Sequence, residues 1–305
     1  MIKKISIVGA GGVGSTLAFN ILTRINLDEL VLVDICPGLA KGVALDLEDT
    51  RGFLHFSTDI KGGDKYSLIK DSEIVVVTAG IARKKGMTRL DLLKINSEIS
   101  KTVANNVKHL APRSIVIAVT NPLDLITYVL TKTTGFPRQR VFGMGSSLDS
   151  GRLFNILHKT IGVSSSSCEG FVYGAHSKDM IVSRNRIKVK GQDPSKVFKN
   201  FNFNDIRKRV QSRGAEIVGF LKNKSANFAP ALACCRLIEA VNFDKNEVIP
   251  VSVLLKGEYG LKDICLGVPC IVNRNGIEKI LEIQLISSEK KELQKTSKLF
   301  RECMM

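Results

Sequence analysis

The fold of this chain is decided by the stretch ISIVGAGGVG, residues 5–14. Its first four residues form a short, mostly apolar run that is rich in β-branched side chains, which predicts a strand. The glycine pattern G-x-G-x-x-G follows at once, and apolar residues at helical spacing continue from Ser15 to Ile25. Such a pattern is weak evidence alone, but the order of strand, glycine turn and helix makes it specific.

Each glycine in this turn has a physical purpose. Gly9 permits the tight turn, Gly11 lets the backbone approach a ligand, and Gly14 lets helix and strand pack closely. The free N–H groups at the start of the helix then bind an anion such as a pyrophosphate. We expect the following residues to contact a dinucleotide: Gly9, Gly11, Gly12, Val13 and Gly14.

Asp34 ends the next apolar run, twenty residues beyond Gly14. A carboxylate in this position accepts hydrogen bonds from the ribose hydroxyls of the adenosine and repels a 2′-phosphate. No arginine follows it, since the next residues are Ile35, Cys36 and Pro37. The sequence therefore favours NAD over NADP as the cofactor.

The first half of the chain alternates short apolar strands with helices. This alternation predicts an α/β fold with a doubly wound parallel sheet, covered by helices on both faces, in an NAD-binding domain of residues 1–144. We expect strands at residues 5–8, 30–33, 73–77, 114–119 and 140–142, and helices at 15–25, 38–49, 91–110 and 123–133.

The pattern changes after about residue 145, where an α+β domain of residues 145–305 is expected to carry the substrate site. No linker-like or low-complexity stretch separates it from the first domain. We expect helices at residues 148–161, 205–221, 230–240 and 288–300, and strands at 169–173, within 180–189, at 248–255 and at 265–272.

The bulk composition, with 44% hydrophobic and 24% charged residues, is typical of a globular enzyme. The sequence has no apolar run of about 18 residues, so no membrane span is expected. Nothing at its beginning suggests export or import, so we expect a cytoplasmic protein. The seven cysteines form no C-x-x-C pair, which argues against a metal site or a disulfide framework and favours free, buried thiols.

The net charge of +16 raises the question of nucleic-acid binding. Much of the excess lies between Lys178 and Lys224, but aromatic residues are not interleaved with these charges as a base-stacking surface requires. Attraction of small anionic substrates is one alternative, and drift of the composition towards lysine is another. We expect no nucleic-acid partner.

Segments along nearly the whole chain resemble the lactate/malate dehydrogenase family. Together they are more specific than any one of them. The matching segments are GAGGVG at 9–14, VTAG at 77–80, RKKGMTRLDLLKIN at 83–96, NPLD at 121–124, LDSGR at 148–152, GAH at 174–176, SANFAP at 225–230 and KGEYG at 256–260.

The resemblance implies a proton relay for interconverting a 2-hydroxy acid and a 2-keto acid. His176 is then the proton donor and acceptor, since histidine titrates near neutrality, and Asp149 is the carboxylate that holds its ring. Arg152 lies one helical turn from Asp149 and is expected to bind the C1 carboxylate of the substrate bidentately. Asn121 is expected to bind near substrate and cofactor, and Asn96 and Val119 to contact the cofactor.

The segment from Gly80 to Leu92 is similar to the mobile lid of the family. Arg89 would polarise the reacting carbonyl. Arg83 occupies the position where malate enzymes have arginine and lactate enzymes have glutamine, so it would pair with the second carboxylate of a dicarboxylate. Pyruvate would leave Arg83 unpaired in a desolvated site, which rejects it strongly. The resemblance thus implies reversible, NAD-dependent oxidation of L-malate to oxaloacetate by a homodimer or homotetramer.

Two segments depart from the family pattern. His176-Ser177-Lys178 replaces the usual His-Gly-Asp, and the added cation is expected to lower the pKa of His176 and shift activity to lower pH. Gly145-Ser146-Ser147 replaces Ala-Gly-Val or Ala-Gly-Thr near the expected nicotinamide position. Two alternatives stay open: an L-lactate dehydrogenase, and a low-activity or non-catalytic NAD-binding protein whose basic face binds polyanions.

Overall fold

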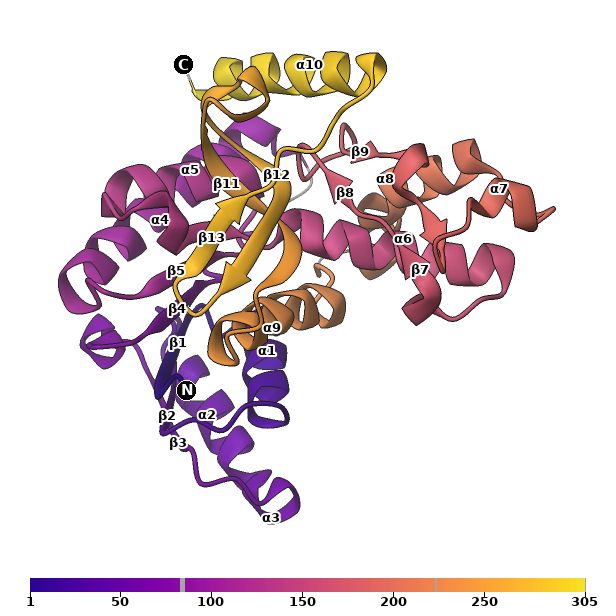
Figure 1. Ribbon diagram of the computed structural model, residues 1–305. Helices are drawn as coiled ribbons and strands as arrows, with labels where there is room; N and C mark the ends of the chain where they lie inside the picture. The colour runs from indigo at the N-terminus through magenta and orange to yellow at the C-terminus, as the bar shows by residue number, and fades with distance from the viewer. Residues whose placement is uncertain (83–85, 223, 305) are drawn as a thin grey trace.

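One twisted sheet runs through the molecule in the computed structural model (Figure 1), which describes residues 1–82, 86–222 and 224–304. In these residues the sheet has nine strands in the order β13-β12-β11-β6-β5-β4-β1-β2-β3. Its first six strands in the chain are β1 (Lys4–Val8), β2 (Glu29–Val33), β3 (Asp59–Gly63), β4 (Ile74–Val77), β5 (Ile115–Ala118) and β6 (Val141–Gly143).

These six strands are parallel, and alternate residues of each enter different layers of the core. In β1, Ile5 and Ile7 pack in one buried cluster while Val8 packs in another. Because both faces are covered, the strands read as continuous apolar runs. The helices of this half are α1 (Gly12–Leu22), α2 (Leu39–Asp49), α3 (Arg51–Leu54), α4 (Arg89–Leu110) and α5 (Leu123–Thr134).

Helices α1 and α2 contribute to the cluster on one face of the sheet, and α4 and α5 contribute to the cluster on the other. This is the doubly wound arrangement that the sequence predicts. The order of strands reverses between β1 and β4, and a ligand crevice forms at the carboxyl ends of strands at such a point.

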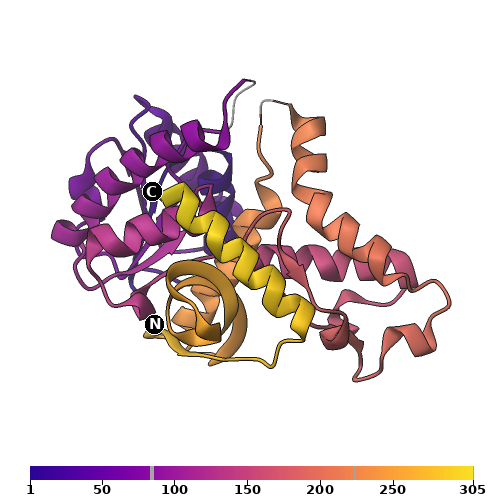
Figure 2. The same cartoon turned by 90° about the horizontal axis from the view of Figure 1, so that it is seen from above.

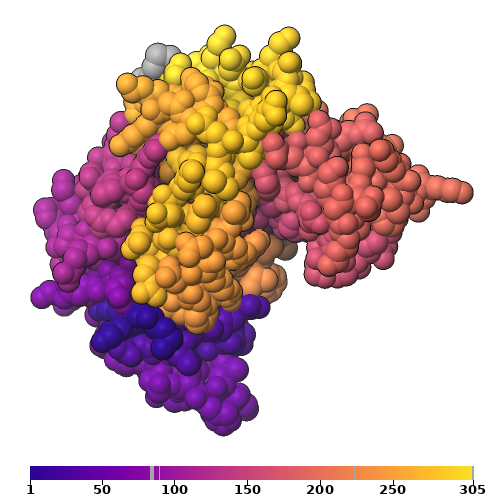
Figure 3. Space-filling model, in the orientation of Figure 1, coloured from indigo at the N-terminus to yellow at the C-terminus, as the bar shows by residue number. Residues whose placement is uncertain are grey.

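A separate lobe follows β6 and stands to one side of the sheet (Figures 1 and 3). Its core packs α6 against α8 and three short strands, β7, β8 and β9. Its elements are α6 (Gly145–Ile161), β7 (Cys168–Glu169), β8 (Val172–Tyr173), β9 (Ile181–Val182), β10 (Lys188–Val189), α7 (Pro194–Val197) and α8 (Phe203–Leu221). The space-filling view shows a hollow between this lobe and the body of the molecule (Figure 3).

The chain then returns to the sheet. Strand β11 pairs antiparallel with β6, where Ser252 lies opposite Gly143, and β12 and β13 extend the same sheet outward. Seen from above, the last helix crosses the outside of these strands (Figure 2). These elements are α9 (Phe228–Asn242), β11 (Glu247–Lys256), β12 (Lys262–Asn273), β13 (Gly276–Ile280) and α10 (Ser287–Met304). Short 3-10 turns are η1 (Tyr66–Ile69), η2 (Arg138–Arg140), η3 (Ser165–Ser167), η4 (Arg184–Arg186) and η5 (Glu258–Gly260).

Among the described residues, no helix combines the length and the apolar character that crossing a membrane requires. Every cysteine is a free thiol: five are buried, Cys303 is partly exposed and Cys36 is exposed. The described part of the chain contains no cluster of histidine, cysteine and carboxylate side chains arranged to hold a metal ion.

Candidate active site

The glycine turn between β1 and α1 is shaped by the space that its missing side chains leave. Gly9 has a φ of 112°, and a Cβ on it would lie 2.5 Å from Thr78 Oγ1. A Cβ on Gly14 would lie 1.9 Å from the carbonyl oxygen of Gly9. A Cβ on Gly11, in contrast, would meet nothing within 4 Å. The first and last glycines are therefore needed for the fold, while Gly11 leaves open backbone for a ligand.

Asp34 follows β2 and turns back to this loop. Its Oδ2 accepts a hydrogen bond of 2.8 Å from the backbone N–H of Ala10, and its Oδ1 accepts one of 2.9 Å from Cys36 N–H. These two bonds fix the carboxylate beside the glycine turn, and lone pairs on both oxygens are left over. The geometry fits the expected role with the adenosine ribose. Since Gly11, the N-cap residue of α1, has no side chain to cap the helix, its first amides suit a pyrophosphate.

A polar scaffold supports the neighbouring strand ends. Thr78 Oγ1 donates to the carbonyl of Gly9 at 2.7 Å. The amide of Asn96 binds both the N–H and the carbonyl of Ile81, and it also donates to the carbonyl of Asn121 at 2.7 Å. Asn96 is buried, and its hydrogen bonds join α4 to the segments at Ile81 and Asn121 at this edge of the sheet. The geometry adds this supporting role to the predicted contact with the cofactor.

Val119 and Asn121 lie at the carboxyl end of β5. Val119 is buried and donates its N–H to the carbonyl of Val77. Asn121 is exposed, and in the described residues its side chain makes no hydrogen bond to His176. Contact of Asn121 with substrate and of Val119 with the cofactor stay predictions.

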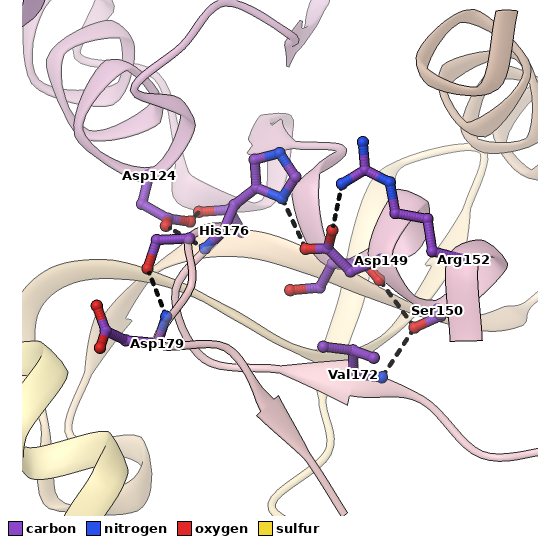
Figure 4. Close-up of polar contacts among 10 residues, drawn as sticks. Asp124, Asp149, Ser150, Arg152, Val172, His176 and Asp179 are labelled. Atoms are coloured by element: carbon purple, nitrogen blue, oxygen red, sulfur yellow. Dashed lines mark hydrogen bonds and ion pairs between the residues drawn. The ribbon is translucent and has the colours of Figure 1, made fainter. Parts of the chain in front are cut away.

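The predicted proton relay comes together on α6. Asp149 and Arg152 project from one face of this helix, and the chain turn after β8 brings His176 to them (Figure 4). His176 Nδ1 lies 2.6 Å from Asp149 Oδ2, and Arg152 Nη1 donates to Asp149 Oδ1 at 3.1 Å. The Asp149 side chain is 0% exposed, and a buried carboxylate requires partners. The Arg152 guanidinium compensates its charge, and the His176 ring does so as well when it is protonated.

The environment of His176 raises its pKa. Burial acts to lower this pKa, but the charge and hydrogen bond of Asp149, together with the charge of Asp124, outweigh burial. The prediction that Lys178 lowers the pKa of His176 is therefore wrong. The Lys178 side chain is exposed to water, which screens its charge, whereas Asp149 touches the ring. We accordingly expect activity to extend to higher pH than for an ordinary histidine.

Asp124, in the first turn of α5, is a second carboxylate at His176 that the sequence analysis quoted only within NPLD. Its Oδ2 accepts from the backbone N–H of His176 at 2.7 Å, and its Oδ1 accepts from Ser252 Oγ at 2.7 Å. Burial raises the pKa of Asp124 to about 6, although the bonds from Ser252 and His176 oppose this effect. Asp124 follows β5 by six residues, and nothing in this local sequence indicates that it contacts His176, which lies 52 residues further along the chain.

The departure at residues 145–147 has a packing explanation. A Cβ on Gly145 would lie 2.9 Å from His176 Cβ and 2.9 Å from Leu123 Cδ2, so glycine lets the histidine pack directly on α6. The Ser146 side chain fills space that Gly267 leaves, since a Cβ on Gly267 would lie 1.7 Å from Ser146 Oγ. Both changes are thus accommodated by neighbours on other segments.

The side chains of two predicted substrate contacts, Arg83 and Arg89, lie outside the described part of the structure. Arg83 is not described at all, and of Arg89 only the backbone, at the start of α4, is described. The capping box of Thr88 and Asp91 fixes where α4 begins. The roles of Arg83 and Arg89 stay predictions.

A doubly wound sheet with this glycine turn, beside a histidine–carboxylate–arginine relay, defines the class of dinucleotide-dependent oxidoreductases. Comparison with family models narrows the class. Residues 3–143 match the lactate/malate dehydrogenase NAD-binding domain, and residues 146–304 match the lactate/malate dehydrogenase α/β C-terminal domain. The chain belongs to the lactate/malate dehydrogenase family, and its cofactor is NAD.

Similar proteins span nearly the whole chain. A malate dehydrogenase of Methanosarcina mazei is 42% identical over 98% of this chain and 97% of its own length. The crystal structure of Cryptosporidium parvum malate dehydrogenase has a TM-score of 0.94 at 34% identity, covering 99% of this chain and 98% of that one. A lactate dehydrogenase of Eimeria maxima, crystallised with NADH and oxamate, has a TM-score of 0.95 at 30% identity, covering 100% of this chain and 93% of that one.

Proposed function

We propose that this protein catalyses the reversible, NAD-dependent oxidation of L-malate to oxaloacetate. The observation that carries the proposal is the single unit of His176, Asp149 and Arg152, in which a proton carrier and a carboxylate-binding group share one buried anion. Relatives named malate dehydrogenase support the substrate class.

The chemistry divides between cofactor and protein. NAD, when bound, accepts or supplies the hydride. Because Nδ1 of His176 faces Asp149, Nε2 is left to exchange the proton with the substrate hydroxyl, and it has no hydrogen-bond partner among the described residues. During oxidation Nε2 takes the hydroxyl proton, and during reduction it returns this proton to the forming alkoxide. The negative charge of Asp149 stabilises the imidazolium in both directions.

Arg152 is the group that binds the C1 carboxylate in this proposal. Its guanidinium lies against α8, where a Cβ on Gly214 would be 3.4 Å from Nη1. Its Nε is buried and has no hydrogen-bond partner among the described residues. A buried donor without a partner is costly, so a substrate carboxylate would relieve it. The second carboxylate is assigned to Arg83, and polarisation of the carbonyl to Arg89, from their positions in the sequence.

The cofactor contacts and the division of the chain are part of the same proposal. NAD would bind along Gly9, Gly11, Gly12, Val13, Gly14 and Asp34, with Asn96, Val119 and Asn121 beyond. The two domains would meet between residues 144 and 145, where α6 begins directly after β6.

We also propose that the protein forms a homo-oligomer. Exposed apolar side chains occur on helices α3, α2, α1 and α9, which contact one another in that order. Phe53, Leu45, Phe19 and Phe228 are among them, and Phe53 is 85% exposed. Exposed apolar side chains on neighbouring helices support burial of this face in a subunit interface. We place the protein in the cytoplasm, because its free thiols suit a reducing compartment.

Steady-state oxidation of NADH with oxaloacetate and with pyruvate tests the proposal, on wild type and on Arg83→Gln. We expect wild type to prefer oxaloacetate by about 10⁴-fold in kcat/KM, since pyruvate leaves Arg83 unpaired, and the variant to lose most of this preference. Lys85→Gln removes a neighbouring charge and is the matched control.

Preference of wild type for pyruvate would instead make the protein a lactate dehydrogenase. Binding of NADH without turnover of either acid would favour the non-catalytic alternative. If Arg83→Gln kept full preference for oxaloacetate, the assignment of Arg83 would be wrong.

A further inference from the structure

The backbone of the His176 turn is attached to a carboxylate from the other half of the chain. Asp124 belongs to α5, at the carboxyl edge of the parallel sheet, whereas His176 follows β8 in the lobe. The His176 N–H donates to Asp124 Oδ2, and Ser252 on β11 donates to the other oxygen. One buried carboxylate therefore joins three segments that are far apart in the sequence.

Asp124 and Asp149 lie on different sides of His176 (Figure 4). Asp149 contacts the ring nitrogen, and Asp124 contacts the backbone N–H of the same residue. Asp124 is buried, and each of its oxygens accepts a hydrogen bond from the protein. We therefore expect it to act through His176 and not by contacting substrate or NAD.

We propose that Asp124 is a positioning residue of the proton relay, which holds the His176 turn on the nucleotide-binding half and adds a second negative charge that favours the imidazolium. This inference rests on the proposed function for its kinetic consequence. Its electrostatic part concerns His176 alone and is measurable without substrate.

Among the described residues, the charged groups that act on His176 and Asp124 can be named. His176 is influenced by Asp149, Asp124 and Arg152, of which Arg152 acts to lower its pKa. Asp124 is influenced by His176 and Asp149, and its charge contributes to raising the pKa of the buried Cys265 thiol on β12. Because the pKa of Asp124 is about 6, this carboxyl is mostly ionised at neutral pH and assists His176 there.

The variant Asp124→Asn separates the effect of the negative charge of Asp124 from the effect of the hydrogen bonds that hold the His176 turn in place. The asparagine Oδ1 can accept from His176 N–H, and its amide can donate to Ser252, whose hydroxyl is able to accept. Asp124→Ala removes both the charge and the bond. Ser252→Ala leaves the carboxylate and its bond to His176, and is the matched control for disturbance of this buried region.

The test is an NMR titration of the histidine rings in wild type and the three variants. The His176 signal is assigned by its loss in His176→Gln. In Asp124→Asn we expect the His176 pKa to fall by about one pH unit. The spectra of the variants are compared with that of wild type to check that the fold is intact. An unchanged His176 titration in Asp124→Asn would overturn the electrostatic part.

Kinetics then test the positioning part. With oxaloacetate, we expect the basic limb of the kcat/KM profile of Asp124→Asn to move to lower pH with the NMR pKa, with kcat at the optimum kept within several-fold. We expect Asp124→Ala to lose at least about tenfold in kcat while its affinity for NADH is unchanged. Wild-type kcat in Asp124→Ala would overturn the positioning part. If wild type reduced no keto acid, the proposed function would fail, while the NMR result would still decide the role of the charge.

Discussion

The two ends of the site are built on different principles. At the glycine turn the decisive feature is absent volume, since added Cβ atoms on Gly9 and Gly14 would meet backbone or side-chain atoms. At the proton relay the decisive feature is charge, since Asp149 is buried between His176 and Arg152. A change of volume should therefore break the first end, and a change of charge the second. The difference teaches which substitution is informative at each place.

The largest expected effect is at the relay. Asp149→Asn keeps volume and removes the charge that orients His176, so we expect kcat to fall by about 10²–10⁴-fold. Without Asp149 the pKa of His176 falls, and the basic limb of the pH profile for oxaloacetate reduction moves to lower pH. Steady-state kinetics from pH 5 to pH 10 measure both effects.

Asp179→Asn is the matched control, because Asp179 lies on the same turn and its side chain makes no hydrogen bond to the His176 ring. NADH affinity, measured by fluorescence, should stay at the wild-type value in both variants. Comparable loss of activity in the two variants would mean that the relay does not depend on Asp149 in particular.

At the glycine turn, Gly14→Ala and Gly11→Ala form a matched pair. A methyl group on Gly14 collides with the Gly9 carbonyl, so we expect a loss of about 1–3 kcal/mol in the free energy of unfolding. Gly11→Ala should leave stability unchanged, because its methyl group would meet no atom of the described residues within 4 Å, and should weaken NADH binding about tenfold or more. Thermal denaturation and NADH titration compare them. Equal stability of both variants would contradict the role of volume.

Gly145→Ala tests whether volume also matters at the relay. The added methyl group must displace His176 or Leu123 by a few tenths of an ångström. We expect about a tenfold loss in kcat, because small misplacements of a catalytic group are costly. Gly151→Ala, on the same helix and with open space around it, is the control. Unchanged kcat in Gly145→Ala would restrict the role of volume to the glycine turn.

The effect expected at Asp34 concerns the choice of cofactor alone. In Asp34→Asn the single amide oxygen can still accept from Ala10 N–H, the acceptor for Cys36 N–H is lost, and the charge that repels a 2′-phosphate is removed. We expect the preference for NADH over NADPH in kcat/KM to fall about tenfold. Asp28→Asn is a surface control, and a preference identical to wild type in Asp34→Asn would show that charge does not select the cofactor.

Much of the fold was predictable because buried parallel strands are continuous apolar runs. The strands at residues 30–33 and 73–77 and the helix at 91–110 lie within one or two residues of the observed ones. Strand β3, with the sequence DIKGG, was missed because it lies at the sheet edge and has only one apolar side chain. The continuation of the sheet through β11–β13 also was not predicted, since pairing with β6 depends on contacts between distant segments.

The active site also has residues that were predictable from the sequence and residues whose role depends on contacts between distant segments. The roles of Asp149 and Arg152 were predicted from the family resemblance, and helical spacing placed both on one face of a helix; the glycine turn was predicted from its motif. The contribution of Asp124 was not predictable, because its partners His176 and Ser252 lie on other segments. The effect of Lys178 was misjudged for a related reason: closeness in sequence to His176 does not place its charge at the buried ring.

The pairing of β6 with β11 has a consequence for how the protein is made. While the chain is being synthesised, the first six strands emerge long before β11. Until then β6 is an unpaired edge strand of the sheet. Its unpaired N–H and C=O groups, beside the fully buried Phe142, form a template for pairing with another chain. A chain cut after residue 144 would keep this edge permanently, and aggregation during expression is the failure to expect of it.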